Sequence, residues 1–120
     1  MATITLTDEQ GIGNKTLTKP FDVAQDALTL RELLRLHVYG EAEEHNAKDN
    51  VVFSGLVQPE SGPKRRVDAE AQFYKAVEAF EQRAFIVLVD DEQVDSLDTV
   101  LNVAAGARVT FLKLVPLVGG

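Results

Sequence analysis

The sequence finishes on two glycines, Gly119 and Gly120, which follow the apolar residues Leu117 and Val118. Glycine has no Cβ, so a diglycine segment can lie in a narrow channel and adopt backbone angles that other residues resist. The carboxylate of Gly120 would then be an acyl group within reach of another protein's active site. Pro116 favours an extended path, because it fixes its own φ and disfavours a helical residue before it. The alternative is an ordinary frayed terminus, since two glycines can end a chain by chance.

A β-type segment directly precedes this tail and would have to position it. Because side chains alternate between the two faces of a sheet, Val109 and Phe111 are predicted to point into the core. Thr110 and Leu112 would point outward. We expect the apolar side chains of the outward face and the tail to dock a partner, and these are Leu112, Leu114, Pro116, Leu117 and Val118. The alternative is that Leu112 and Leu114 cover an irregular edge of the core.

The first half of the chain predicts a hairpin followed by a helix. Residues 3–7 and 16–18 alternate as short strands, and the turn-rich residues 8–14 between them predict a long loop. A helix is expected to begin near Thr29, whose hydroxyl can cap its first free N–H groups. Gly40 and the acidic residues after it weaken the pattern, so the helix either ends there or continues as a solvated extension. The stripe expected to pack on the hairpin consists of Leu30, Leu33, Leu34 and His37, with Val38 at its edge.

The second half of the chain predicts a loop, a second helix and the rest of a sheet. Residues 58–66 are a loop by their prolines, glycine and charge, and residues 68–83 show helical spacing. The apolar run at 84–89 predicts a central strand, residues 93–94 would return antiparallel, and Gly106 would turn the chain into the last strand. The expected apolar anchors are Phe73, Ala76, Val77, Phe80, Leu97 and Leu101. This order predicts a small α+β domain with one mixed sheet on one main helix.

Composition and charge exclude several classes of function. The 120 residues are 45% hydrophobic and 26% charged, which fits one globular domain with a real core. The net charge of −7 argues against nucleic-acid binding, which depends on clustered lysine and arginine. No apolar run is long enough for a membrane span, and residues 1–6 lack an export signal, so a cytoplasmic protein is expected. The chain has no cysteine, which excludes disulfides, thiolate metal sites and cysteine nucleophiles.

Three stretches of the last third, residues 85–94, 97–101 and 106–112, together with the tail at 116–120, resemble the β-grasp family of ubiquitin-like proteins and sulfur carriers. That family includes the small subunit of molybdopterin synthase, the thiamine-pathway sulfur carrier and the ubiquitin-related modifier. Residues 29–34 are similar to the start of the family's main helix. The resemblance implies a β-grasp domain at 1–115, with an inserted loop and second helix at about 47–83, and an extended diglycine tail at 116–120.

The chain departs from the family pattern in three places. Ala105 and Ala107 flank Gly106, where the family usually has acidic residues, and Asp90 and Asp91 occupy a turn that commonly carries Asn-Gly. The residues at about 47–66 have no counterpart in the compact carriers. None of these changes touches the tail chemistry, but the extra length leaves the subfamily open between a cofactor-pathway carrier and a ubiquitin-like modifier.

The resemblance implies a protein co-substrate and not an enzyme. A carboxylate is a poor acyl donor, so Gly120, next to Gly119, would first be adenylated by a ubiquitin-activating-type enzyme that uses ATP and Mg²⁺. Sulfide from a sulfur donor would then give a thiocarboxylate that delivers sulfur to a cofactor precursor or a tRNA base. Alternatively, a lysine of a target protein would give an isopeptide bond, or the module would be non-catalytic and its diglycine inert. This chain itself is expected to bind no cofactor.

No metal site is expected from the sequence. His37 lies on the predicted helix stripe and His45 in a polar stretch, with no spacing that converges on an ion. A satisfied or solvated histidine is the favoured interpretation of each. The aspartates at 90, 91, 95 and 98 resemble a carboxylate cluster, but aspartate is favoured at turns for its backbone hydrogen bonds.

Overall fold

The computed structural model describes residues 2–10, 15–46 and 68–114. These residues form an α+β domain, as the sequence predicts. The predicted loop at 58–66 and the tail at 116–120 lie outside the described residues. In chain order the elements are β1 (Ala2–Gln10), β2 (Lys15–Val23), β3 (Ala27–Thr29), α1 (Leu30–Asn46), α2 (Ala69–Glu81), β4 (Phe85–Val89), β5 (Glu92–Val94), β6 (Val100–Asn102) and β7 (Arg108–Lys113).

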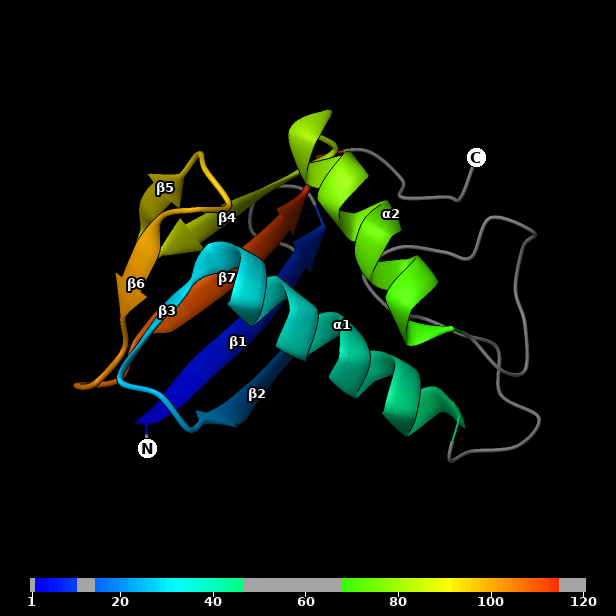
Figure 1. Cartoon of the computed structure of the whole chain (residues 1–120). Coiled ribbons are helices and arrows are strands. Elements are labelled where there is room, and N and C mark those ends of the chain that lie inside the picture. The colour runs from blue at the N-terminus through cyan, green and yellow to red at the C-terminus, as the bar shows by residue number, and fades with distance from the viewer. Residues whose placement is uncertain (1, 11–14, 47–67, 115–120) are drawn as a thin grey trace.

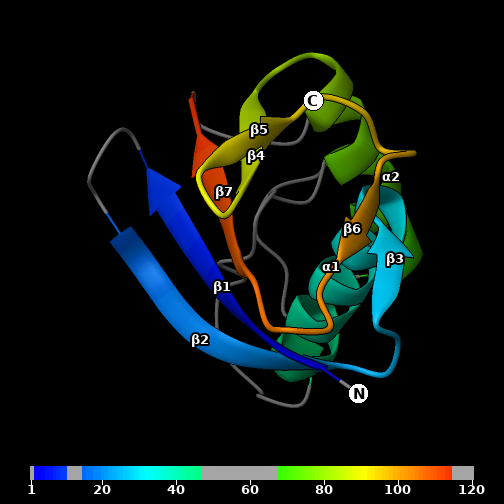
Figure 2. The same cartoon turned by 90° about the vertical axis from the view of Figure 1, so that its left-hand side faces the viewer.

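The main sheet is mixed and has the order β2-β1-β7-β4-β5 (Figure 1). β7, the last strand of the described chain, lies at its centre. It runs parallel to β1, with Leu6 opposite Val109, and antiparallel to β4, with Val87 opposite Phe111. Figure 2 shows both helices on one side of this sheet. β3 and β6 form a separate two-stranded sheet, which the sequence did not predict, and this sheet joins the start of α1 to the segment between β5 and β7.

The hairpin strands are longer than predicted. β1 continues to Gln10 and β2 begins at Lys15, so Asp8 belongs to a strand and not to the loop. A register shift between Asp8 and Glu9 marks the place where the regular pairing with β2 changes. The turn-forming composition of residues 8–14 concealed this extension, because aspartate and, to a lesser degree, glutamate are uncommon in strands.

The main helix begins where the sequence predicts. The hydroxyl of Thr29 accepts a hydrogen bond from the backbone N–H of Glu32 at 3.1 Å. The N–H groups of Leu30 and Arg31 donate to the carbonyl oxygens of Thr99 and Leu97 at 3.0 and 2.9 Å. The helix does not end at Gly40 but continues to Asn46. Its buried residues are Leu30, Leu33, Leu34, His37, Val38, Ala42 and His45, so the predicted stripe is confirmed and extended.

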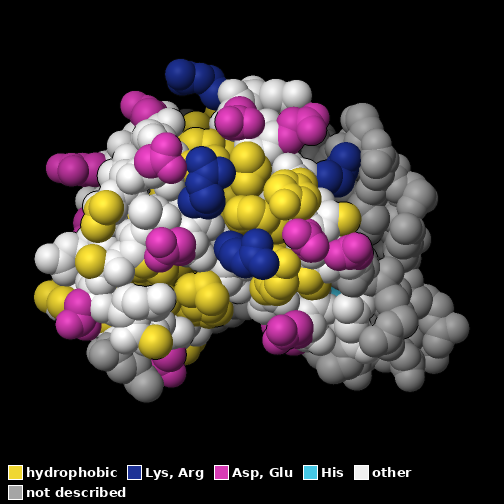
Figure 3. Space-filling model, viewed as in Figure 1, with side chains coloured by type: hydrophobic (Ala, Val, Ile, Leu, Met, Phe, Trp, Pro, Cys, Tyr) yellow, Lys and Arg dark blue, Asp and Glu magenta, His cyan; other side chains and the backbone are white. Residues whose placement is uncertain are grey.

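The second helix packs against the first. Asp68 caps it, because its Oδ1 accepts hydrogen bonds from the N–H groups of Glu70 and Ala71 at 2.9 and 3.3 Å. Phe73 and Ala76 of the predicted face are buried. The guanidinium of Arg35 on α1 lies over the Phe73 ring at 5.4 Å. Figure 3 shows hydrophobic and charged side chains interspersed on the face that carries both helices. None of the described helices is both long and apolar enough to cross a membrane.

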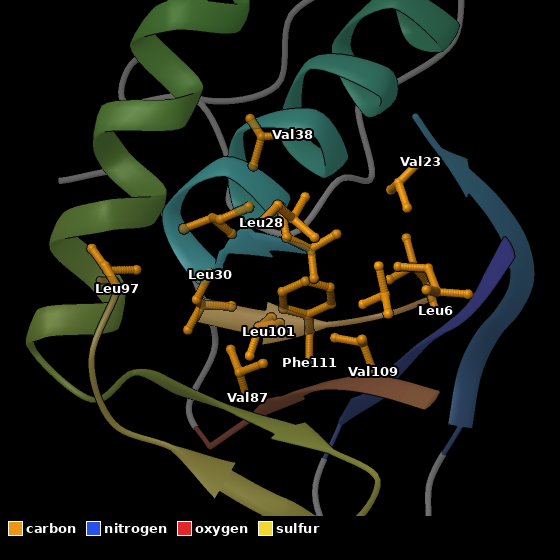
Figure 4. Packing of buried hydrophobic residues seen from close by; sticks show 14 of the residues in the cluster. Leu6, Val23, Leu28, Leu30, Val38, Val87, Leu97, Leu101, Val109 and Phe111 are labelled. Carbon is orange, nitrogen blue, oxygen red and sulfur yellow. The ribbon is translucent and has the colours of Figure 1, made fainter. Parts of the chain in front are cut away.

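The core lies between the main sheet and α1. Figure 4 shows the Phe111 ring directed from β7 towards α1, with Val109 and Leu6 beside it. Val109 and Phe111 are fully buried, which confirms their predicted inward direction. Thr110 and Leu112, however, are also buried, at 6% and 9% exposure, although both were expected to be outward and available. The central position of β7 contributes to this burial, because residues 109–113 have β1 on one side and β4 on the other.

Candidate functional site

The end of β7 is the described part of the predicted tail site. The backbone N–H of Leu114 donates a hydrogen bond of 2.9 Å to the carbonyl oxygen of Ala84. Ala84 immediately precedes β4, so this bond fixes the last described residue beside the start of the neighbouring strand. The tail residues assigned to docking and chemistry lie outside the described residues, and these are Pro116, Leu117, Val118, Gly119 and Gly120.

The two leucines predicted to dock a partner differ in availability. Leu114 is 51% exposed, so a partner can contact it. Leu112 is buried and lies opposite Ile86 of β4 and Glu9 of β1 in the sheet register. Leu112 therefore supports the end of β7 by packing, as the alternative interpretation held, whereas the docking role of Leu114 stays a prediction.

A surface hollow of about 320 Å³ lies beside the start of β4. It is lined by residues from the first turn of α1, from the end of α2 and the turn after it, from β4, and from β5 and the segment that follows it. The charged residues among them are Arg31, Glu81, Arg83, Asp95 and Asp98. Arg31 and Asp98 approach each other to 3.4 Å, and both side chains are largely exposed. Charges of both signs line this hollow.

A second site lies inside the domain, where β1 meets α1. Nε2 of His37 is 3.7 Å from Oδ1 of Asp8 and 3.6 Å from Oε2 of Glu41. The His37 side chain is only 1% exposed, and those of Asp8 and Glu41 are 9% and 11% exposed. Among the residues that the structure describes, neither ring nitrogen of His37 has a hydrogen-bond partner. The expectation of a satisfied or solvated histidine is therefore wrong for His37, because this ring is buried and its polar contacts within the described residues are these two longer ones.

The sequence contained part of the signal for this cluster. His37 and Glu41 are four residues apart, which places them on one face of a helix. The missing element was Asp8, since its assignment to a loop removed it from the inner face of the sheet. In β1, Asp8 lies on the same face of the strand as Ile4 and Leu6, because alternate residues point the same way. Both Ile4 and Leu6 are buried.

The aspartates after β4 do not form a comparable cluster. Asp90 and Asp91 adopt positive φ values of 50° and 70° in the turn, and Oδ1 of Asp90 accepts a hydrogen bond from the Arg108 N–H at 2.9 Å. Asp98 pairs with Arg31 instead. Within residues 2–10, 15–46 and 68–114, the one convergence of three potential metal ligands is that of Asp8, His37 and Glu41.

Comparison of the chain with protein-family models, with curated proteins and with solved structures found no match. The described residues define a small α+β domain with a mixed five-stranded sheet and helices packed on one face of it. Its two distinctive places are the end of the central strand β7 and the buried cluster of Asp8, His37 and Glu41.

Proposed function

We propose that this chain is a β-grasp protein of the ubiquitin-like and sulfur-carrier kind, and that Gly120 carries its reactive carboxylate. A ubiquitin-activating-type enzyme would adenylate that carboxylate with ATP and Mg²⁺, and a sulfur donor would convert it into a thiocarboxylate. The chain would then deliver sulfur in the biosynthesis of a cofactor or a modified tRNA. It acts as a co-substrate, so the partner enzyme supplies the catalytic residues and binds the nucleotide.

The observation that carries this proposal is the position of the last described strand. β7 lies between β1 and β4 and runs parallel to β1, and the hairpin of β1 and β2 forms one side of the sheet. α1 follows the hairpin and packs across the sheet face. This order of hairpin, helix, strand pair and central final strand agrees with the β-grasp arrangement that the sequence resembles.

The sheet also holds in place the residues of β7 that directly precede the tail. Phe111 is buried in the core, and Leu114 is held to Ala84 through its backbone. Residues 115–120 follow, and six residues in an extended chain reach at most about 20 Å. A partner that contacts the exposed Leu114 side chain could therefore bind the carboxylate in a channel within that distance.

The chemistry needs activation because a carboxylate has no usable leaving group. A carboxylate oxygen of Gly120 would attack the α-phosphorus of ATP, which forms the acyl-adenylate and releases pyrophosphate. The outer sulfur of a donor persulfide would then attack the acyl carbon and AMP would leave, which gives an acyl disulfide. A second thiol of the partner proteins would attack the donor sulfur of that disulfide, form a disulfide with the donor and release the thiocarboxylate. A lysine amine would instead displace AMP, directly or through a partner thioester, and form an isopeptide bond.

A second candidate is a protein modifier attached through Gly120 to lysines of other proteins. The specific observation in its favour is α2, which lies between α1 and β4 and packs on α1. The sequence resemblance assigns α2 to the segment at about 47–83 that is inserted relative to the compact carriers, so α2 would add a surface beyond theirs. Lysines of the chain itself could then accept further copies, and these are Lys15, Lys19, Lys48, Lys64, Lys75 and Lys113.

Intact-mass spectrometry separates the candidates. The chain, with Gly120 as its last residue, is incubated with an adenylating enzyme from the same source, ATP, Mg²⁺ and a sulfur donor. A mass gain equal to replacement of one oxygen by sulfur supports the carrier, and conjugates with lysine-containing proteins support the modifier. An unchanged mass with every enzyme of this class from that source would contradict both. The mass of the protein isolated from its source checks that Gly120 ends the active form.

A further inference from the structure

The buried cluster of Asp8, His37 and Glu41 has the composition and geometry of a metal-binding site. Asp8 reaches it from β1, and His37 and Glu41 reach it from successive turns of α1. One potential ligand atom from each of the three residues lies within 4.8 Å of the other two. The three side chains thus bring one imidazole nitrogen and two carboxylate oxygens to a common point from two different elements.

His37 is the strongest indication that this point accommodates a ligand. Its ring stacks on Phe111, with centroids 4.7 Å apart and planes inclined by 5°. The stack restrains the ring plane, and Nε2 lies 3.7 Å from Asp8 and 3.6 Å from Glu41. Both ring nitrogens are buried without a hydrogen bond to any described residue, whereas buried polar groups in folded proteins nearly always have a partner. Asp8 and Glu41 take part in further interactions, which would help to orient them.

We propose that Asp8, His37 and Glu41 bind one divalent transition-metal ion, with Zn²⁺ as the preferred ion. Ligands placed 2.0 to 2.2 Å from a tetrahedral zinc ion lie about 3.3 to 3.6 Å apart. The separations of 3.6 and 3.7 Å between Nε2 and the two carboxylates are close to this range, and all three ligand atoms lie within 4.8 Å of one another, so rotation of the carboxylates towards the ion would complete the site. Nε2 is the ligating nitrogen, which leaves the ring proton on Nδ1.

The ligand set also decides which ions are favoured. An imidazole nitrogen suits zinc, iron, copper and nickel, whereas magnesium and calcium prefer oxygen ligands alone. Two carboxylates balance the charge of a divalent ion when the imidazole is neutral. Three protein ligands leave the fourth zinc position for a water molecule. The ion would join β1 to α1 directly below Phe111, and this proposal is independent of the chemistry proposed for Gly120.

Calorimetric titration of the full chain with ZnCl₂, after treatment with a chelator and dialysis, tests the site. The unmodified chain is expected to bind one ion per molecule, with no comparable response to MgCl₂. Glu41→Gln keeps the shape of the side chain but removes a ligand charge, and it should weaken zinc binding by at least about tenfold. Glu43→Gln makes the same charge change at an exposed position of α1 and should bind zinc as the unmodified chain does.

Nitrogen-detected NMR of the histidine rings provides the second readout. The chain has two histidines, and His37→Asn identifies the His37 signals. Stoichiometric zinc is expected to shift the Nε2 signal of His37 in the unmodified chain and in Glu43→Gln. This experiment uses the unmodified chain and Glu43→Gln, so it tests whether zinc binds to His37 even if Glu41→Gln fails to fold.

Two results would overturn the metal site. Equal zinc affinities for the unmodified chain and a folded Glu41→Gln would place the ion elsewhere on the surface. A His37 ring that is protonated on both nitrogens and unchanged by zinc would show that a buried ion pair with the carboxylates occupies the cluster instead.

Discussion

The ring of His37 lies flat against the ring of Phe111, with their planes inclined by 5° and their centroids 4.7 Å apart. This stack joins the main helix to the central strand, because His37 belongs to α1 and Phe111 to β7. Phe85 of β4 approaches the same Phe111 ring at 6.3 Å. Phe111 therefore connects α1 with two strands of the sheet, three residues before Leu114.

Truncation of this ring should be among the most damaging core substitutions. Phe111→Ala is expected to lower the free energy of unfolding by about 3 to 5 kcal/mol, since the cavity lies between a sheet and a helix that cannot close on it. Leu112→Ala should cost about 2 kcal/mol or more, because Leu112 is also buried. Urea unfolding measures both values. A smaller cost for Phe111→Ala than for Leu112→Ala would contradict the inward direction of Phe111.

The exposed end of β7 should matter for partner binding and not for stability. Leu114→Ala is expected to raise the KM of the adenylating enzyme for this chain by about tenfold, as loss of an anchoring apolar contact of about 1.4 kcal/mol would. Its unfolding free energy should change by less than about 0.5 kcal/mol, because the side chain is half exposed. Val100→Ala removes an exposed apolar side chain from β6 and serves as the control. Equal KM values for the two variants would exclude Leu114 from docking.

The cap of α2 gives a test of the second helix. Asp68→Ala should destabilise the domain by about 1 kcal/mol, because it leaves the N–H groups of Glu70 and Ala71 without their side-chain acceptor. Asp68→Asn retains an acceptor oxygen and should lose much less. Thermal unfolding followed by circular dichroism compares the three proteins. An unchanged melting temperature for Asp68→Ala would mean that α2 contributes little to the stability of the domain.

The elements that the sequence predicted are those with strong local signals. Thr29 precedes a clean apolar stripe and caps α1, and the run before Asp90 is apolar enough to identify β4. Gly106 has a φ of +86°, which glycine adopts without strain, and it turns the chain towards β7 as expected. In each case the residue type alone restricts the backbone, so no knowledge of the neighbouring elements is needed.

The features that the sequence missed depend on contacts between distant residues. Leu112 has the alternation of an outward residue, but its burial follows from the position of β7 between two other strands. Asp8 looked like a turn residue, and only the extension of β1 brings it to His37. The small sheet of β3 and β6 consists of three-residue strands, which are too short to show a period.

Pyrophosphate exchange tests the central claim most directly, because it reports the adenylation of Gly120 before any sulfur or lysine chemistry. The measured quantity is the incorporation of labelled pyrophosphate into ATP by a ubiquitin-activating-type enzyme from the same source, with this chain as the acyl substrate. The unmodified chain should support exchange. A chain that lacks Gly119 and Gly120 should keep its circular dichroism spectrum and support none. Equal exchange by both proteins, or none by the unmodified chain with every such enzyme, would contradict the proposed role of the diglycine carboxylate.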